Sequence, residues 1–116
     1  MAATELQAIV RFQFHDGNVE EFKRLSEACM EIVRRQDTGT LQYDTYFNED
    51  ETECIVIERF RDSEALIQHG ENLAHLMDAI IATGSVSGEL LGEPSPELHA
   101  RLADSPVRLF APWATM

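Results

Sequence analysis

The sequence is short of cysteine, of basic residues and of long apolar runs, and each shortage excludes a class of protein. The two cysteines, Cys29 and Cys54, form no C-x-x-C motif, so we expect two small buried hydrophobic side chains rather than a redox or metal site. No apolar run approaches the ~18 residues that span a membrane, and the first residues lack the pattern of an export signal. We therefore expect a soluble, cytoplasmic protein.

Basic residues are scarce, since nine Lys and Arg stand against 21 Asp and Glu, which gives a formal net charge of -12. A surface of this sign repels the phosphates of nucleic acids and of anionic lipids, and no local basic patch compensates for it. The sequence also contains no G-x-G-x-x-G dinucleotide motif and no set of ligands for iron or copper. We therefore expect no nucleic-acid partner, no membrane partner and no cofactor.

The chain does have a clear change of hydrophobic period, which divides it into strands and helices. Its 116 residues, 44% of them apolar, suffice for a single domain with one modest core. LQAIVRFQF alternates as a strand does, and the segment from Asn18 to Gly39 repeats at helical spacing. The later elements are a hairpin of TLQYDTYF and ECIVIERF, a helix from Asp62 or Ser63 to Gly84, a strand in SVSGELLG and a short helix near Pro96.

The order of these elements, β-α-β-β-α-β, is that of an α+β ferredoxin-like fold, in which an antiparallel sheet carries both helices on one face. In ECIVIERF, Ile55 and Ile57 alternate with Cys54, Val56 and Phe60, so both faces of this strand are apolar. No further long helix is available to cover the second face. We therefore expect a homodimer in which the sheets of two copies pack face to face.

The core of this fold spans about residues 5–92, which leaves residues 93–116 as a C-terminal extension. Within the extension, SPVRLFAPW is weakly strand-like and has no other assignment. We interpret the extension as a cover over the partner or over the mouth of a pocket.

The most specific motif lies where the hairpin runs into the second helix. Glu58, Phe60, Asp62, Ala65 and His69 meet the pattern E-x-F/Y/W-x-D-x-x-A-x-x-x-H. With this pattern the chain resembles the antibiotic biosynthesis monooxygenase family of dimeric α/β barrels over most of residues 5–92. The resemblance implies small, cofactor-free oxygenases of quinol or polycyclic phenol substrates. The family also includes isomerases and haem-degrading proteins, so it indicates the fold better than the reaction.

One branch of that family is disfavoured by the residues of this chain. The haem-degrading members combine an asparagine on the first strand with a tryptophan and a histidine near the second helix. Here the first strand has no asparagine, and the one tryptophan, Trp113, lies in the C-terminal extension. The resemblance therefore does not imply haem degradation.

Two of the four histidines lie in HGENLAH on the second helix. On a helical wheel His69 falls inside an apolar stripe, whereas His75 lies towards the polar face. Metal-binding histidines of one helix are usually about three or four residues apart, so a spacing of six favours no metal site. If Gly70 interrupts the helix, free N–H groups near His69 favour an anionic oxygen instead. The stripe consists of Leu66, Leu73, Leu76, Met77 and Ile80.

Two interpretations of His69 stay open: a core histidine bonded within the protein, or the polar feature of an apolar ligand pocket. In the second, His69 is the general base, Asn72 donates to the phenolate oxygen and Glu58 orients the imidazole. Glu58 could equally lie at the wet edge of the sheet. Tyr43 and Tyr46 lie on opposite faces of their strand, so only one of them can line a given pocket. The residues expected to contact the substrate are Tyr43, Phe60, Leu73 and Leu76.

Three functions are compatible with these residues. A cofactor-independent monooxygenase takes a small aromatic substrate and molecular oxygen, because a deprotonated quinol or naphthol itself supplies the electrons. It needs an apolar cavity of roughly 300 Å³ or more that reaches His69. An isomerase-type relative needs a polar cavity instead. A non-catalytic dimer binds a small ligand, or none, and has a filled interior.

Overall fold

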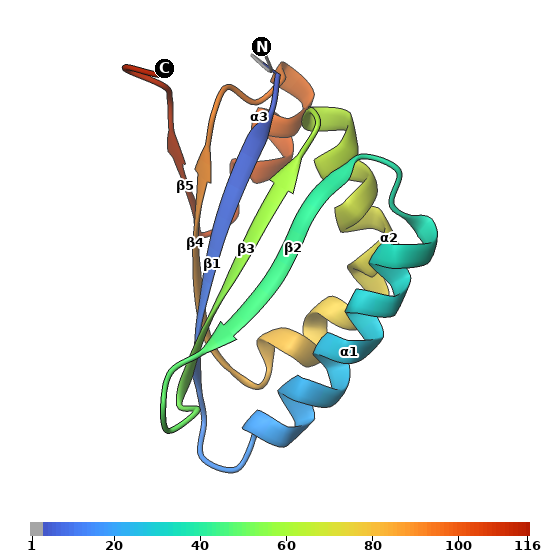
Figure 1. The fold of residues 1–116 in the computed structure, drawn as a ribbon, viewed down its shortest axis with the longest axis vertical. Coiled ribbons are helices and arrows are strands. Elements are labelled where there is room, and N and C mark those ends of the chain that lie inside the picture. Colours follow the sequence, from blue (N-terminus) through green and yellow to red (C-terminus); the bar gives the residue numbers. More distant parts are fainter. Residues whose placement is uncertain (1–3) are drawn as a thin grey trace.

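The structure, a computed structural model, describes residues 4–116 and follows the order β-α-β-β-α-β before it adds α3 and β5 (Figure 1). The ferredoxin-like α+β fold predicted from the sequence is therefore confirmed. The elements are β1 (Leu6–Phe14), α1 (Val19–Gln36), β2 (Thr40–Phe47), β3 (Glu53–Phe60), α2 (Ser63–Ile81), β4 (Gly84–Leu91), α3 (Pro96–Leu102) and β5 (Val107–Phe110).

The strands form one sheet in the order β2-β3-β1-β4-β5, with β1 at its centre. The first four strands pair antiparallel, as expected for this fold. β5 pairs parallel with β4, so that Gly88 lies beside Val107 and Leu91 beside Phe110. Parallel neighbours need a crossover connection, and the segment that contains α3 provides it. The C-terminal extension thus widens the sheet by one short edge strand that the sequence indicated only weakly.

The second helix begins at a capped position and is continuous. Asp62 precedes α2, and its Oδ1 accepts a hydrogen bond from the Ala65 backbone N–H at 2.9 Å. The helix runs through Gly70, so the alternative in which this glycine interrupts the helix is wrong. Gly70 is exposed, and a Cβ atom placed on it would meet nothing within 4 Å. His69 therefore keeps the position that the helical wheel assigns to it.

The core lies between the sheet and the two long helices, which cover the same face (Figure 1). Cys29 and Cys54 are both buried in it, as predicted, with exposed fractions of 0% and 2%. A second cluster joins the start of β1 and the end of β4 to α3. The buried members of the main cluster are Phe12, Phe22, Leu25, Cys29, Val33, Cys54, Val56, Leu73 and Ile80.

The sheet face opposite α1 and α2, called the open face below, carries no helix within the described residues (Figure 1). Tyr46 and Ile55 on this face are 55% and 37% exposed, and Ile9 and Ile57 beside them are half-buried. This exposure agrees with the predicted second apolar face of β3.

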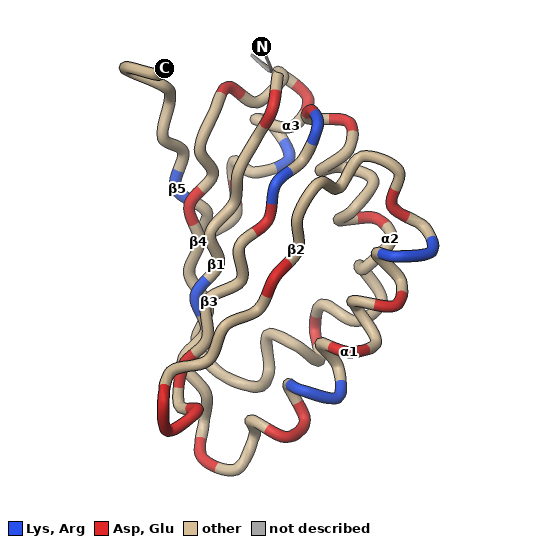
Figure 2. Tube along the Cα trace, in the orientation of Figure 1, with Lys and Arg blue, Asp and Glu red and all other residues tan. Residues whose placement is uncertain are grey.

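Figure 2 shows where the acidic and basic residues lie along the strands of the sheet. By strand register the open face carries three arginines and three acidic residues, and Glu5, directly before β1, adds a fourth acid that pairs with Arg59 at 2.8 Å. Most of the net charge of -12 therefore lies elsewhere on the chain. Arg11 and Glu89 form an ion pair on the open face at 3.0 Å. The charged residues of the open face strands are Arg11, Arg59 and Arg108, with Asp44, Glu53 and Glu89.

Among residues 4–116, none of the helices combines the length and the apolar character that crossing a membrane requires.

Candidate functional site

His69 lies on the face of α2 that packs against the sheet, and it is 7% exposed. Leu73 and Ile80 are buried on the same helix, so His69 does belong to the apolar stripe that the sequence predicted. A buried imidazole in such a stripe needs polar partners for its ring nitrogens. The sequence alone did not identify the main one.

That partner is Asp37, the residue that follows the last turn of α1. Its Oδ2 atom lies 2.7 Å from His69 Nδ1, and its Oδ1 atom accepts a hydrogen bond of 2.8 Å from Asn72 Nδ2. The Thr40 hydroxyl donates a further hydrogen bond of 2.6 Å to Oδ2. Burial raises the pKa of Asp37, but the hydrogen bonds from Thr40, Asn72 and His69 lower that pKa by more. Asp37 is therefore an ionised, well-bonded carboxylate inside the protein.

The charge on Asp37 determines which nitrogen of His69 carries the proton. An ionised carboxylate can only accept, so Nδ1 must donate the hydrogen bond to Asp37. Burial lowers the pKa of His69, and this effect exceeds the rise caused by Asp37. The imidazole is therefore neutral at pH 7, with the lone pair of Nε2 free to act as a base.

Glu58 on β3 lies on the other side of the ring. Its Oε1 atom is 3.7 Å from His69 Nε2, which is too long for a hydrogen bond. Burial, and secondly the negative charge of Asp37, raise the pKa of Glu58 to about 8. Glu58 is therefore mostly protonated at neutral pH. Glu58 does not lie at a solvent-exposed edge of the sheet, because its side chain is only 12% exposed. The residue that holds the imidazole of His69 in place is Asp37.

Two aromatic rings enclose the imidazole. The Tyr43 ring is 5.3 Å from the His69 ring, and the Phe60 ring is 5.0 Å away on β3. Both make edge contacts, at interplanar angles of 66° and 60°. Burial raises the pKa of Tyr43 far above its ordinary value, and Glu58 adds to this effect. The phenol is therefore neutral, and its hydroxyl lies beside the buried thiol of Cys29.

The predicted residues are thus partly brought together. His69, Asn72, Glu58, Tyr43 and Phe60 lie around one polar cluster in the core. Two others, Leu73 and Leu76, pack in the main hydrophobic core cluster.

The two histidines of HGENLAH lie in different environments. His75 is exposed on α2, and His69 is buried. Within the described part of the chain, no group of three or more His, Cys, Asp and Glu side chains is placed to hold a metal ion.

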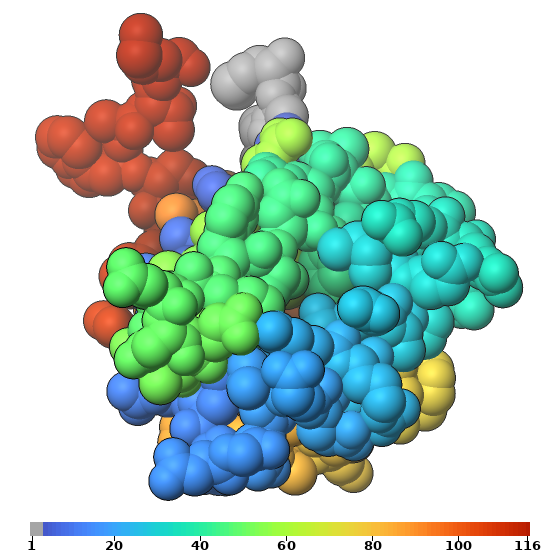
Figure 3. Space-filling view, turned by 60° about the horizontal axis from the view of Figure 1, so that its bottom comes forward, coloured from blue at the N-terminus to red at the C-terminus, as the bar shows by residue number. Residues whose placement is uncertain are grey.

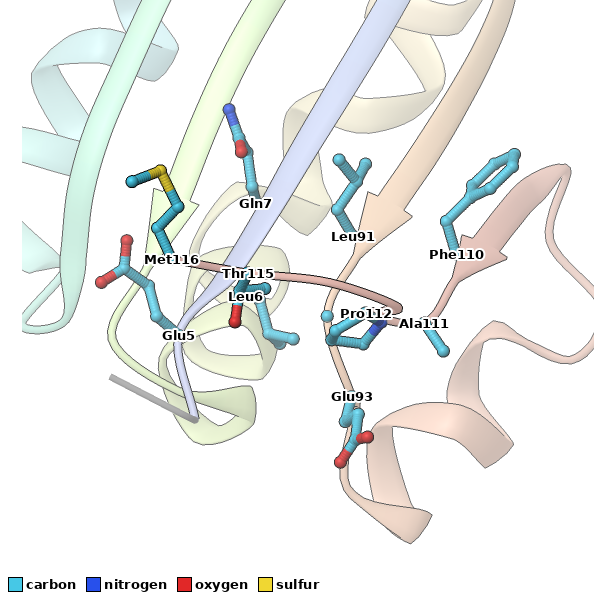
Figure 4. Close-up of a pocket in the computed structure, with 11 residues that line it drawn as sticks. Glu5, Leu6, Gln7, Leu91, Glu93, Phe110, Ala111, Pro112, Thr115 and Met116 are labelled. Carbon is cyan, nitrogen blue, oxygen red and sulfur yellow. The ribbon is translucent and has the colours of Figure 1, made fainter. Parts of the chain in front are cut away.

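His69 lines neither of two pockets that open on the surface of the described residues. One has a volume of about 630 Å³ and lies between the C-terminal tail and the ends of β1 and β4 (Figure 4). The other, of about 430 Å³, lies between α1 and β2 and includes Met30 and Tyr46. Neither is the apolar cavity at His69 that the sequence led us to expect. Around His69 the space is occupied by Asp37, Tyr43 and Phe60.

Asp37 was missed because it lies 32 residues from His69 in the chain, outside any local motif. One signal was available in the sequence. The carboxyl end of a helix favours cations, and Arg34 and Arg35 in the last turn of α1 follow that rule. An aspartate directly after them opposes it, which indicates that another interaction holds this residue in place.

Comparisons with known proteins agree with the fold. The sequence profile described as antibiotic biosynthesis monooxygenase matches residues 6–77. Among solved structures, MupZ from Pseudomonas fluorescens is similar, with a TM-score of 0.85 and 23% identity over 97% of this chain and 88% of that chain. PA3566 from Pseudomonas aeruginosa has a TM-score of 0.68 and 25% identity over 82% and 99%. No curated protein sequence matches the chain.

A third solved structure is described by its reaction type. SnoaB from Streptomyces nogalater, a cofactor-independent oxygenase, has a TM-score of 0.67 and 17% identity over 79% of this chain and 95% of that chain. At this identity the likeness concerns the fold alone.

Proposed function

The chain belongs to the antibiotic biosynthesis monooxygenase family, and from this premise we propose that it is a cofactor-independent monooxygenase of a quinol or polycyclic phenol substrate. One observation carries the proposal. His69 is a buried, neutral imidazole whose Nδ1 is bonded to Asp37 and whose Nε2 faces the neutral acid Glu58. A base and an acid whose facing atoms lie 3.7 Å apart are the parts that cofactor-free chemistry requires.

In the proposed reaction His69 Nε2 accepts the phenolic proton of the substrate. The phenolate then passes one electron to molecular oxygen, and the resulting radical and superoxide combine as a peroxide. Loss of water from the peroxide leaves a carbonyl group on the substrate, so one oxygen atom enters the product and the other becomes water. All four electrons come from the substrate, which is why the reaction requires no cofactor.

The remaining residues have supporting roles in this proposal. Asp37 positions the imidazole and fixes its tautomer, because it bonds Nδ1. Glu58 donates its proton to the oxygen on which negative charge develops. Asn72 directs one amide N–H to Asp37, and its second N–H is the proposed donor to the phenolate. The predicted substrate contacts of Tyr43, Phe60, Leu73 and Leu76 belong to the same proposal.

We also propose that the working form is a homodimer in which the open faces of two copies meet. The open face carries exposed Tyr46 and Ile55, and its three arginines offset three of its four acidic residues. Two copies with a charge of -12 each repel each other less through this face than through their more acidic surfaces. Sedimentation at micromolar concentration tests this arrangement, and a monomer would contradict it.

Oxygen uptake with a quinol or naphthol tests the proposed activity. His69→Ala should lower turnover by ~100-fold or more, because it removes the base. The matched control is His75→Ala, which changes an exposed histidine of the same helix and should leave turnover unchanged. A folded His69→Ala variant with wild-type turnover would mean that His69 is only a core histidine.

A proton-transfer isomerase is the second candidate, and the protonation state of Glu58 favours it. A neutral carboxylic acid beside a neutral imidazole can deliver one proton and remove another without oxygen. Turnover of a candidate substrate under strict exclusion of oxygen would support the isomerase, and it would contradict the monooxygenase. Ligand binding without turnover in either condition would leave a non-catalytic dimer.

A further inference from the structure

Residues 37–39, called the Asp37 turn below, join α1 to β2 and lie beside the first half of α2 (Figure 1). Figure 3 shows the end of α1 and the start of β2, coloured cyan to green, as one continuous surface, and Thr38 in the turn is exposed. The Asp37 side chain is nevertheless only 1% exposed. An ionised carboxylate is strongly favoured in water, so a surface turn releases it unless further contacts hold the turn in place.

Four residues of α2 meet the Asp37 turn, and they lie on one face of the helix. They follow the spacing i, i+3, i+4 and i+7, which places side chains on the same side of a helix. His69 and Asn72 bond the Asp37 carboxylate. The other two, Ala65 and Gln68, lie against the rest of the turn. This face of α2 is therefore a seat for the whole turn and not for the carboxylate alone.

Gln68 holds the Asp37 turn by two hydrogen bonds. Its Oε1 atom accepts one from the Thr38 backbone N–H at 2.9 Å and one from the Thr38 hydroxyl at 3.1 Å. A backbone N–H can only donate, so the amide oxygen of Gln68 must face the turn. On the other side, the Asp37 N–H donates to the Val33 carbonyl oxygen at 3.2 Å. Asp37 is therefore fixed along the chain by α1 before it and by Gln68 after it.

Gly39 allows the turn to come close enough for these bonds. A Cβ atom placed on Gly39 would lie 2.5 Å from the Ala65 Cβ atom, which is far inside the contact distance of two carbon atoms. The φ angle of Gly39 is not positive, so the backbone conformation itself does not require glycine. The Gly39 carbonyl oxygen also accepts a hydrogen bond from the Arg61 N–H at 2.8 Å. Glycine is thus required at this position by the close contact with α2.

We propose that Gln68 is a positioning residue of the site, because it holds the Asp37 turn and thereby keeps the Asp37 carboxylate on His69 Nδ1. Gly39 is the second requirement, since it lets the turn reach Gln68. Gln68 acts through Thr38 and Asp37, so it is not a catalytic residue. The effect on turnover rests on the function proposed above, whereas the effect on the tautomer of His69 does not.

¹⁵N NMR of the His69 imidazole tests the proposal directly. The wild type should show one tautomer, with the proton on Nδ1. Gln68→Met keeps an unbranched side chain of similar length and removes the amide acceptor, so the spectrum should show a mixture of both tautomers. Gln68→Glu should restore the single tautomer, because a carboxylate accepts the same two hydrogen bonds. The matched control is Gln36→Met, which changes an exposed glutamine directly before Asp37 and should leave the spectrum unchanged.

A pair of size changes tests the contact between the turn and α2. Gly39→Ala alone should displace the turn, because its methyl group overlaps the Ala65 Cβ atom, and should give the same mixture of tautomers. Ala65→Gly in the same chain removes the overlapping atom, so the double variant should return to the single Nδ1 tautomer. A double variant that stays mixed would overturn the role given to this contact. Ala65→Gly alone is the control and should keep the wild-type tautomer.

Oxygen uptake adds the catalytic readout. Gln68→Met should lower kcat by about 10-fold or more and leave KM nearly unchanged, because the base is misplaced while the substrate contacts remain. A Gln68→Met variant with a single Nδ1 tautomer would overturn the proposal, and so would a lower kcat without a change of tautomer. If no quinol or naphthol supports oxygen uptake, the proposed function fails, and the NMR comparison alone decides whether Gln68 positions His69.

Discussion

Glu58→Gln should stabilise the protein by an amount that grows with pH. Burial, followed by the charge of Asp37, raises the pKa of Glu58 to about 8 from an ordinary value of 4.5. Between these two values the folded state holds a proton that the unfolded chain has released. The free energy of unfolding therefore falls as pH rises from 4.5 to about 8, and the loss is constant at higher pH because both states are then ionised. Glutamine stays neutral and avoids this loss.

The size of the effect follows from the same two pKa values. One pH unit corresponds to about 1.36 kcal/mol, so the interval from 4.5 to about 8 sets an upper bound of roughly 5 kcal/mol. The Glu58 side chain is 12% exposed, and solvent and structural relaxation reduce the penalty. We expect a gain of roughly 2 to 4 kcal/mol for Glu58→Gln near pH 9, or ~8 to 16 °C in Tm. Near pH 4 the variant and the wild type should be about equally stable.

Urea denaturation of both proteins across this pH range is the assay, and exposed Glu27→Gln on α1 is the matched control. The control should shift stability by less than ~0.5 kcal/mol at every pH. If the difference between wild type and Glu58→Gln stays constant from acid to alkaline pH, Glu58 ionises at its ordinary pKa. The assignment of Glu58 as a neutral acid would then be wrong.

Three further predictions concern Asp37, the pH dependence set by Glu58 and His69, and two glycines. Asp37→Asn should lower turnover by roughly 100-fold or more, because an amide does not require the proton to be on Nδ1 of His69. ¹⁵N NMR of the His69 imidazole should show the altered tautomer, and an unchanged tautomer would contradict the role assigned to Asp37. The value of kcat/KM should decline above about pH 8, where Glu58 loses its proton, and also in acid, below the lowered pKa of His69. If a Glu58→Gln variant keeps the alkaline decline, Glu58 is not its cause. Gly84→Ala should destabilise the fold by roughly 1 to 3 kcal/mol in urea denaturation, because the new Cβ would collide with the Gln13 carbonyl oxygen. Gly70→Ala, in open space on α2, should instead stabilise the fold by about 0.5 to 1 kcal/mol. Equal effects at the two sites would refute this steric reasoning.

The sequence predicted the elements whose signal is periodic. Alternation in residues 6–14 and helical spacing after Asn18 give β1 and α1 directly, because one face of each element is buried. β5 gives a weak signal because it is short and mostly exposed, and because it pairs parallel at the edge of the sheet. Its partner β4 is reached only through the α3 crossover, which local pattern does not reveal.

The candidate site was predicted in part, and the part that was missed is not local. His69 was found because a polar residue interrupts an apolar stripe, and that signal lies within one helix. Asp37 comes from a different helix and meets His69 only after the chain has folded. Glu58 was expected either to orient the imidazole or to lie in water, and it does neither. Tyr43 lies opposite Glu58 in the sheet, and α2 covers Glu58, so burial raises the pKa of the Glu58 carboxyl.

The central place of β1 in the sheet affects how the chain can fold as it leaves the ribosome. β1 is synthesised first, yet both of its neighbours come late, β3 starting at Glu53 and β4 at Gly84. Its hydrogen-bonding edges therefore stay unpaired, and its apolar residues stay uncovered, until most of the chain has been synthesised. Pairing at such sequence separation is slow, and a strand with two open edges is prone to pair with the wrong chain. The nascent protein thus becomes safe from aggregation only once the segment through Leu91 has left the exit tunnel.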